Sequence, residues 1–462
     1  MVLAGVDNLL FAVEDQQLKI HSLHQEVAAC RIEAAALREE AAALQDCLAE
    51  AGVLSPARVP AQLHRRRFER ARARHGWRPG AQLEQLLGAR ELALALVARA
   101  GVELRSARAA SRAVGRAFGE ALAAVRPGRS RLYVCGGGMA ARELRSAERF
   151  DPAAGTWEAL PPMLERRRNA IAAAMAGHLY VCGGWQDAQP LRSAERFDPA
   201  LGAWEALPSM LERRRYAVAA AIRGRLYVCG GGEYAEPLSS AESFDPAAGA
   251  WEALPAMLEG RMRAMAAAIS DSFYVCGGLS ASQRLSSAER LDPERGVWEA
   301  LPPMSTRREG AAVAVIAGQL YVCGGWGAAR ALESAERFSP VVGAWYMLPP
   351  MWERRESTAA AVVAGKLYVC GGCTDMQVSN SAECFDPASD SWQLLPPMSV
   401  RRKGALAVAI AGSLHVCGGL DHANPLSSVE RFDPAAGGAW TSLPPMAERR
   451  GWAAAAAVVA GT

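Results

Sequence analysis

The hexapeptide LYVCGG at residues 132–137 decides the fold, because it returns at one constant interval along most of the chain. Identical copies begin at residues 179, 226, 320 and 367, while FYVCGG begins at 273 and LHVCGG at 414. The seven starting residues are each 47 apart. A period of roughly 20–50 residues is typical of arrays in which each repeat forms one supersecondary unit. The sequence therefore predicts seven copies of one structural unit.

Residues 179–225 show what one unit contains. The apolar run LYVC ends at Gly183-Gly184, and SAERF ends at a turn signal, Asp198-Pro199. AWEAL ends at Pro208, and YAVAAAI ends at Gly224. Four short strands fill the unit and leave no room for a helix. Four antiparallel strands per repeat are typical of a propeller blade.

Further landmarks accompany the double glycine in the units. Ser-x-Glu-x-Phe-Asp-Pro is followed by a Trp six residues after the Asp, and then by Leu-Pro-x-Met. This pattern resembles the kelch repeat and extends over 132–462, about seventy per cent of the chain. The resemblance implies an all-β seven-bladed kelch β-propeller, placed after an N-terminal α-helical or coiled-coil region.

The order of segments predicts how the ring closes. No first strand precedes Leu132, whereas the chain continues past the seventh Trp with ERRGWAAAAAVVAGT. We expect residues 451–460 to supply the innermost strand of the blade that begins at 132. Such closure leaves no blade incomplete and removes free sheet edges.

Three positions are the same in all seven units. We interpret the Trp as a wedge between neighbouring blades, and the Glu and Arg as polar struts that must pair if they are buried. A catalytic ring is the alternative, but a catalytic site needs asymmetry. The Trp residues are 157, 204, 251, 298, 345, 392 and 440, the Glu residues 148, 195, 242, 289, 336, 383 and 430, and the Arg residues 167, 214, 261, 308, 355, 402 and 450.

Loops alternate between two faces of a propeller because successive strands are antiparallel. The loop after each Gly-Gly and the segment after each Met share one face, and they differ from unit to unit. Resemblance to kelch propellers implies that partner peptides bind there, whereas ordinary drift among repeats is the alternative. The predicted partner-binding residues are Asn169, Trp185, Asp187, Tyr216, Glu233, Tyr234, Arg263, Glu309, Trp326, Glu356, Asp375, Lys403, Asp421, His422 and Trp452.

An enzymatic function has less support in the sequence than partner binding. Kelch propellers resembling galactose oxidase use Tyr and His ligands around copper, yet His178, His415 and His422 lack the spacing of a metal set. We expect no cofactor and no metal. A ubiquitin-ligase adaptor is a second alternative, although residues 1–131 show no α/β pattern of the BTB domain that such adaptors usually carry.

The front of the chain carries a different pattern. Apolar residues recur every seven positions over 6–51, which predicts a coiled coil in 1–51 and a homodimer, with a single amphipathic helix as the alternative. We expect residues 52–130 to form a basic, Ala/Arg-rich helical linker, before a propeller at 131–462. Within it, 64–78 could contact nucleic acid or an anionic membrane, but a solvated helix face is the simpler interpretation.

The compartment follows from the cysteines and from the apolar runs. Seven of the 11 cysteines occupy one repeat position, too far apart in neighbouring units to form disulfides. We interpret them as buried residues in a reducing compartment. The first residues lack the basic leader of a signal peptide, and no run of about 18 apolar residues predicts a membrane span. The expected location is cytoplasmic, with the nucleus as the alternative.

Overall fold

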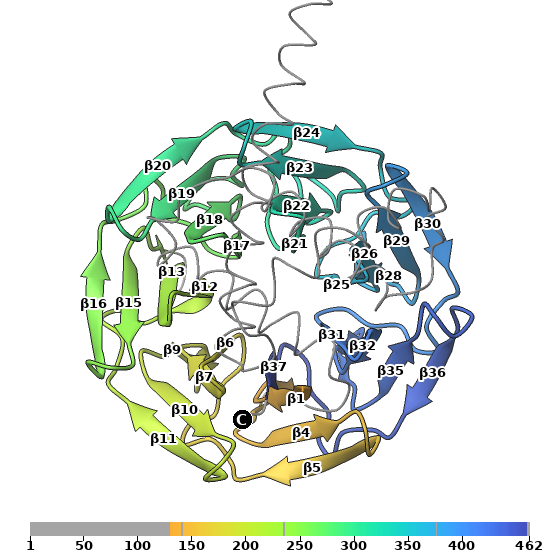
Figure 1. The fold of residues 1–462 in the computed structure, drawn as a ribbon, viewed down its shortest axis with the longest axis horizontal. Helices are drawn as coiled ribbons and strands as arrows, with labels where there is room; N and C mark the ends of the chain where they lie inside the picture. Colours follow the sequence, from red (N-terminus) through yellow and green to blue (C-terminus); the bar gives the residue numbers. More distant parts are fainter. Residues whose placement is uncertain (1–129, 140–141, 234–235, 376, 460–462) are drawn as a thin grey trace, which may run out of the picture. The chain divides into compact units, whose positions relative to one another are not determined.

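The computed structural model describes residues 130–139, 142–233, 236–375 and 377–459. These residues form seven antiparallel sheets arranged as the blades of a ring, each with four main strands (Figure 1). The seven-bladed all-β propeller predicted from the repeat is therefore confirmed. The predicted coil at 6–51 and the basic segment at 64–78 lie outside the described residues. Within the described residues, no helix has the length and apolarity needed to cross a membrane.

Each blade runs from an innermost strand at the ring axis to an outer strand at the rim (Figure 1). From the first to the seventh blade, the innermost strands are β37 (Ala454–Val459), β6 (Ile171–Met175), β12 (Arg215–Ile222), β17 (Met265–Ile269), β21 (Ala312–Ile316), β25 (Ala359–Val363) and β31 (Leu406–Ile410). The second strands are β1 (Ser130–Cys135), β7 (His178–Cys182), β13 (Arg225–Glu233), β18 (Ser272–Cys276), β22 (Gln319–Cys323), β26 (Lys366–Cys370) and β32 (Ser413–Cys417).

The third and outer strands complete the same seven blades. The third strands are β4 (Ala147–Asp151), β10 (Ala194–Asp198), β15 (Ala241–Asp245), β19 (Ala288–Asp292), β23 (Ala335–Ser339), β29 (Ala382–Asp386) and β35 (Val429–Phe432). The outer strands are β5 (Thr156–Leu160), β11 (Ala203–Leu207), β16 (Ala250–Leu254), β20 (Val297–Leu301), β24 (Ala344–Leu348), β30 (Ser391–Leu395) and β36 (Trp440–Leu443).

Small hairpins interrupt the loop between the second and third strands, which the sequence had not indicated. They form because this loop is long enough to fold back on itself and pair locally. They are β2 (Gly138–Met139) with β3 (Arg142–Glu143), β8 (Trp185–Gln186) with β9 (Gln189–Pro190), β14 (Glu236–Pro237) with the end of β13, β27 (Cys373–Thr374) with β28 (Gln377–Val378), and β33 (Leu420–Asp421) with β34 (Asn424–Pro425).

The first blade contains strands from both ends of the repeat array. β37 pairs antiparallel with β1 over six residue pairs, from Ser130 opposite Val459 to Cys135 opposite Ala454. β37 also packs beside the innermost strands of the second and seventh blades, β6 and β31. The ring is thereby closed without a break between its first and last blades.

Apolar side chains fill the spaces between blades. Seven buried clusters each join two neighbouring blades. Between the first and second blades, Tyr133 and Phe197 lie with ring centroids 5.9 Å apart. The repeated Trp adds a polar link, since Trp204 Nε1 donates to the carbonyl of Pro161 in the preceding blade at 2.8 Å. The Trp residues thus connect blades, and all but the 9%-exposed Trp392 are half-buried.

The double glycine has a steric cause. Gly183 has φ +60°, and a Cβ added there would lie 2.5 Å from the carbonyl oxygen of Arg214. Any larger residue would displace the backbone that carries Arg214. The glycine therefore lets the end of one strand approach the segment that leads to the next blade.

Candidate functional site

Two faces of the ring differ in what they carry. We call the face with the loops after each Gly-Gly the loop face, and the opposite one, with the Asp-Pro turns, the turn face. The loop face also carries the crossovers, which we define as the segments joining each outer strand to the innermost strand of the next blade. One example is residues 349–358, between β24 and β25. The predicted partner-binding residues that the structure describes fall on the loop face.

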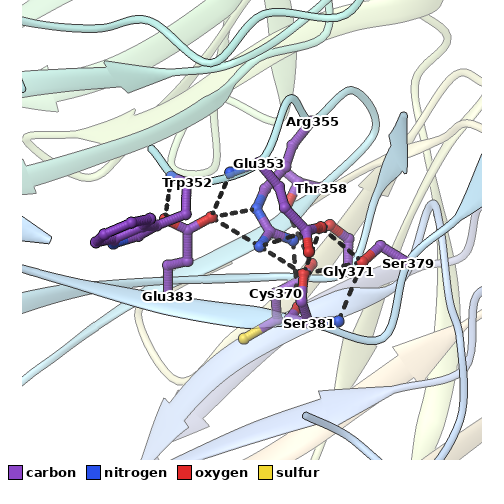
Figure 2. A network of polar contacts seen from close by, with 9 residues as sticks. All are labelled: Trp352, Glu353, Arg355, Thr358, Cys370, Gly371, Ser379, Ser381 and Glu383. Atoms are coloured by element: carbon purple, nitrogen blue, oxygen red, sulfur yellow. Dashed lines mark hydrogen bonds and ion pairs between the residues drawn. The ribbon is translucent and has the colours of Figure 1, made fainter. Parts of the chain in front are cut away.

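Each crossover is tied to the following blade by a buried arginine. Figure 2 shows the example of Arg355, whose Nε and Nη2 donate to Glu383 Oε1 at 3.1 and 2.8 Å. Its Nη1 donates to the carbonyl of Gly371 at 2.8 Å, and Nη2 to the Ser381 hydroxyl at 2.7 Å. The second oxygen of Glu383 accepts the backbone N–H of Trp352 at 2.7 Å. Charge and hydrogen bonds are thus satisfied together, as a buried ion pair requires.

The same tie is present in all seven blades. Every one of these arginines is at most 1% exposed, and every glutamate at most 2%. Because the same pair recurs in every blade, although the donating nitrogen differs between blades, we assign it to cohesion of the ring. The pairs are Arg167–Glu195, Arg214–Glu242, Arg261–Glu289, Arg308–Glu336, Arg355–Glu383, Arg402–Glu430 and, across the closure, Arg450–Glu148.

Immediately after each buried arginine the chain makes a turn that leads into the innermost strand of the next blade. The residue two positions on has a left-handed backbone in every blade, with φ between 49° and 58°. Backbone hydrogen bonds then join neighbouring blades, for example from Arg263 N to Tyr216 O at 3.1 Å and from Gly310 N to Arg263 O at 2.9 Å. Non-glycine residues in this region cost about 1 kcal/mol or more, so neighbouring contacts must hold them. These seven residues are Asn169, Tyr216, Arg263, Gly310, Ser357, Gly404 and Trp452.

The predicted residues of this segment therefore occupy two successive positions. Asn169, Tyr216, Arg263 and Trp452 are at the left-handed position, whereas Glu309, Glu356 and Lys403 are one residue earlier. The earlier position forms backbone bridges with the loop after the Gly-Gly pair, as between Glu309 and Trp326. The side chains at the two positions thus have different surroundings.

Aromatic rings and guanidinium groups alternate over the second to fourth blades. Arg215 lies over the ring of Trp185, 4.2 Å from its centroid, and 5.6 Å from that of Tyr216. Arg263 also lies over the ring of Tyr216, 4.5 Å from its centroid. Trp185 is only 9% exposed, while Arg263 is exposed and Tyr216 half-buried. This stack combines arginine with aromatic side chains, residue types that are enriched at protein interfaces.

A charged cluster continues around the axis from the fourth to the seventh blade. Arg284 Nε donates to Glu309 Oε1 at 2.9 Å, and Glu309 is only 6% exposed. Burial raises the pKa of Glu356, against the opposing influence of Lys403 and Arg263. Three cations thus surround two carboxylates, and this part of the loop face has a net positive charge.

The remaining predicted residues lie outside this stack and this charged cluster, and one of them lies outside the described residues. Trp326 is half-buried, with Arg284 5.9 Å from its ring centroid, and the Trp452 ring covers Gly404. Tyr234 lies outside the described residues. The residues at hairpin tips, exposed except for the half-buried Asp421, are Asp187, Glu233, Asp375, Asp421 and His422.

Sequence reasoning missed one pocket on the loop face. It has a volume of about 450 Å³ and lies between the crossovers before and after the sixth blade. Trp352, Arg354 and Arg401 are among its lining residues. The signal was present, because the residue after each repeat Met is Leu164, Leu211, Leu258, Ser305, Trp352, Ser399 or Ala447, and only one is aromatic.

The described residues include few groups that could act as nucleophiles or bind a metal ion. Burial raises the pKa of the seven repeat cysteines, such as Cys182, to about 12, so that they are thiols at neutral pH. Burial lowers the pKa of His415 to about 4. No group of three or more His, Cys, Asp or Glu among these residues could hold a metal ion.

Comparisons with known proteins agree with the repeat pattern. The model of the Kelch motif matches seven segments, at residues 122–164, 166–211, 213–258, 261–305, 307–351, 354–399 and 401–447. Comparison with curated proteins gives no match. Among solved structures, 850 chains match, including the structure of YjhT, with 15% identity and a TM-score of 0.51 over 62% of this chain and 99% of that one. At that identity the likeness shows the fold alone.

Proposed function

Because the chain belongs to the kelch-repeat family, we propose that it is a non-enzymatic scaffold whose propeller binds a protein or peptide partner on the loop face. One observation carries the proposal. Buried arginines that are the same in every blade stand one or two residues before positions that vary around the ring and surround its axis. A repeated frame that displays unrepeated side chains is what recognition of one particular surface requires.

The chemistry of these side chains supports a protein partner. The stack of Trp185, Arg215, Tyr216 and Arg263 offers aromatic and guanidinium groups held by one another and by the strained backbone. Preorganised groups lose little conformational freedom on binding, which favours affinity. The thiols of the repeat cysteines are buried and protonated, which supports a non-catalytic role for them.

The test is quantitative affinity capture with matched variants of the full chain. The loop-face variant carries Tyr216→Ala, Arg263→Ala and Trp452→Ala. The control carries Leu201→Ala and Val341→Ala, two residues of the turn face that are 80% and 76% exposed. We expect specific partners to be retained by the control and lost by the loop-face variant, with both proteins folded by circular dichroism. Partners that survive the loop-face changes would contradict the proposal.

We also propose that residues 6–51 join two copies of the chain, which would raise the effective concentration of the second propeller for paired targets. The heptad spacing of the sequence supports this. Analytical ultracentrifugation of the full chain and of residues 123–462 tests it. A dimer for the first and a monomer for the second are expected, and equal stoichiometry would remove the claim.

A further inference from the structure

The pocket beside the sixth blade is the part of the loop face that the repeat pattern does not account for. Its lining comes from two crossovers, from the hairpin of β27 and β28 with the loop that follows it, and from Glu333 in the loop before β23. The hairpin contributes Thr374, Gln377 and Val378, and the loop that follows contributes Asn380. A polar wall with one apolar side chain is suited to a short peptide segment more than to a purely apolar ligand.

Trp352 forms the apolar wall of the pocket, and its backbone is fixed by a hydrogen bond to a buried glutamate. It is 67% exposed, although its backbone N–H is bound by the buried Glu383. Figure 2 shows its indole pointing away from Arg355 and Ser381, with the rest of the network on the other side. A large ring on an immobilised backbone gives apolar contact area at little conformational cost.

Two carboxylates and two guanidinium groups line the pocket, and Arg401 differs from the other three in its partners. Glu353 accepts hydrogen bonds from the hydroxyls of Ser379 and Ser381, at 3.0 and 2.6 Å. Glu333 accepts one from Arg354 Nε at 3.1 Å. Arg401 is exposed, and within the described residues its side chain has no ion pair or hydrogen bond.

The sequence of this crossover also differs from that of the others. In five of the other six crossovers, including the one that carries Glu353, a glutamate precedes the corresponding arginine or glycine, but Val400 precedes Arg401. The substitution removes a carboxylate next to Arg401. The pocket therefore holds one cation that a bound group could neutralise.

We propose that this pocket binds a short segment of a protein partner in which a carboxylate side chain stands next to a large apolar one. The carboxylate pairs with Arg401, and the apolar side chain lies on Trp352. One unpaired guanidinium matches one negative charge, whereas a phosphate dianion would also face the carboxylates of Glu333 and Glu353. The inference rests on the proposed function and adds a second contact site to it, away from the ring axis.

The experiment measures binding of acetylated, amidated peptides of sequence Gly-Ser-Glu-Phe-Ser-Gly to the full chain by saturation-transfer NMR. Replacing Glu by Gln in the peptide should weaken binding about threefold, the effect of one exposed ion pair. Arg401→Ala should abolish that difference. Trp352→Ala should weaken both peptides about tenfold, as loss of an aromatic anchor does.

Matched variants come from the same repeat positions in other blades. Arg449→Ala is the control for Arg401, and Leu258→Ala, which removes a residue 64% exposed, is the control for Trp352. Both controls should bind as the unchanged protein does. The proposal is wrong if the Glu and Gln peptides bind equally, if the controls weaken binding as much, or if a phosphoserine peptide binds more tightly than the Glu peptide.

Failure of this inference can be told from failure of the proposed function. If partners are captured equally by the Trp352→Ala and Arg401→Ala proteins but lost by the variant at Tyr216, Arg263 and Trp452, the loop-face proposal holds and the pocket assignment is overturned. If partners are lost with the pocket variants and retained by their controls, the pocket is part of the interface.

Discussion

Arg402 and Lys403 are neighbours in the chain, yet they belong to two different regions of the molecule. Arg402 is fully buried and donates to Gly418, Ser428 and Glu430, and an arginine makes the same bonds in every other blade. Lys403 is half-buried near the ring axis, and its position holds a different residue in most blades. The comparison teaches that cohesion and recognition are separated by a single peptide bond. We call the buried arginine–glutamate pairs and the blades that they join the frame. Residues of the loop face can vary without weakening this frame.

The strongest test of the frame removes the strand that closes it. Deleting residues 453–462 takes away β37 and its six pairs with β1. It also exposes the apolar space that Val458 fills between the first and second blades. We expect a loss comparable with the whole stability of a domain, about 5–15 kcal/mol, and hence no cooperative thermal transition in circular dichroism. Deleting only 460–462 keeps every pair and should leave the transition unchanged, and a cooperative transition in the longer deletion would contradict closure by β37.

The buried tie should be sensitive to loss of one partner. Arg214→Met leaves Glu242 buried without its cation, which should destabilise the protein by about 3–5 kcal/mol in urea denaturation. The control is the preceding residue, because Arg213→Ala removes only partly exposed contacts, with Glu233 and with the carbonyl of Pro190, and should cost about 1 kcal/mol or less. The double variant Arg214→Met, Glu242→Leu should recover part of the loss. Equal losses of stability for the variants at residues 213 and 214 would contradict the claim that the buried arginine stabilises the ring more than a surface arginine does.

One blade carries a histidine where the others have tyrosine, and it should give the frame a pH dependence. Burial lowers the pKa of His415 to about 4, below its unfolded value near 6.5. The unfolded chain therefore binds a proton first, so stability is complete above pH 6.5 and falls as the pH drops to 4, by at most about 3 kcal/mol. His415→Tyr restores the residue of the other blades, and its urea midpoint should fall less between pH 7 and pH 4. Parallel curves for the two proteins would refute this.

The loop face should tolerate change far better than the frame. Tyr216→Ala removes the ring beneath Arg263 but no buried hydrogen bond, so we expect a loss of about 1 kcal/mol or less in urea denaturation. Binding of captured partners should nevertheless weaken. A large loss of stability with partner binding intact would assign Tyr216 to the frame instead.

The sequence predicted the parts of the molecule that repeat. Seven occurrences of Gly-Gly, Glu, Trp and Arg predicted the blades. The cost of burying unpaired charges indicated that the Glu and Arg must be paired if they are buried, and the structure pairs them with each other, as Arg355 with Glu383. The heptads of residues 6–51 lie outside the described residues, and dimerisation stays a prediction.

The unrepeated parts were less accessible from sequence. Trp185 and Glu309 were predicted as binding residues, yet they are 9% and 6% exposed, because backbone bridges draw their positions under neighbouring loops. The pocket at Trp352 and Arg401 was missed, since it depends on segments that only the folded ring brings together. Patterns along one unit give the blade, whereas contacts between different loops need the structure.

Hydrogen exchange of the full chain with and without a captured partner tests the central claim most directly. The account predicts that partner binding slows exchange in the crossover and loop segments, at residues such as 166–169, 213–216 and 185–190, and leaves the Asp-Pro turns at residues such as 199–202 unchanged. Protection of the turns, with the crossovers exchanging as before, would contradict it.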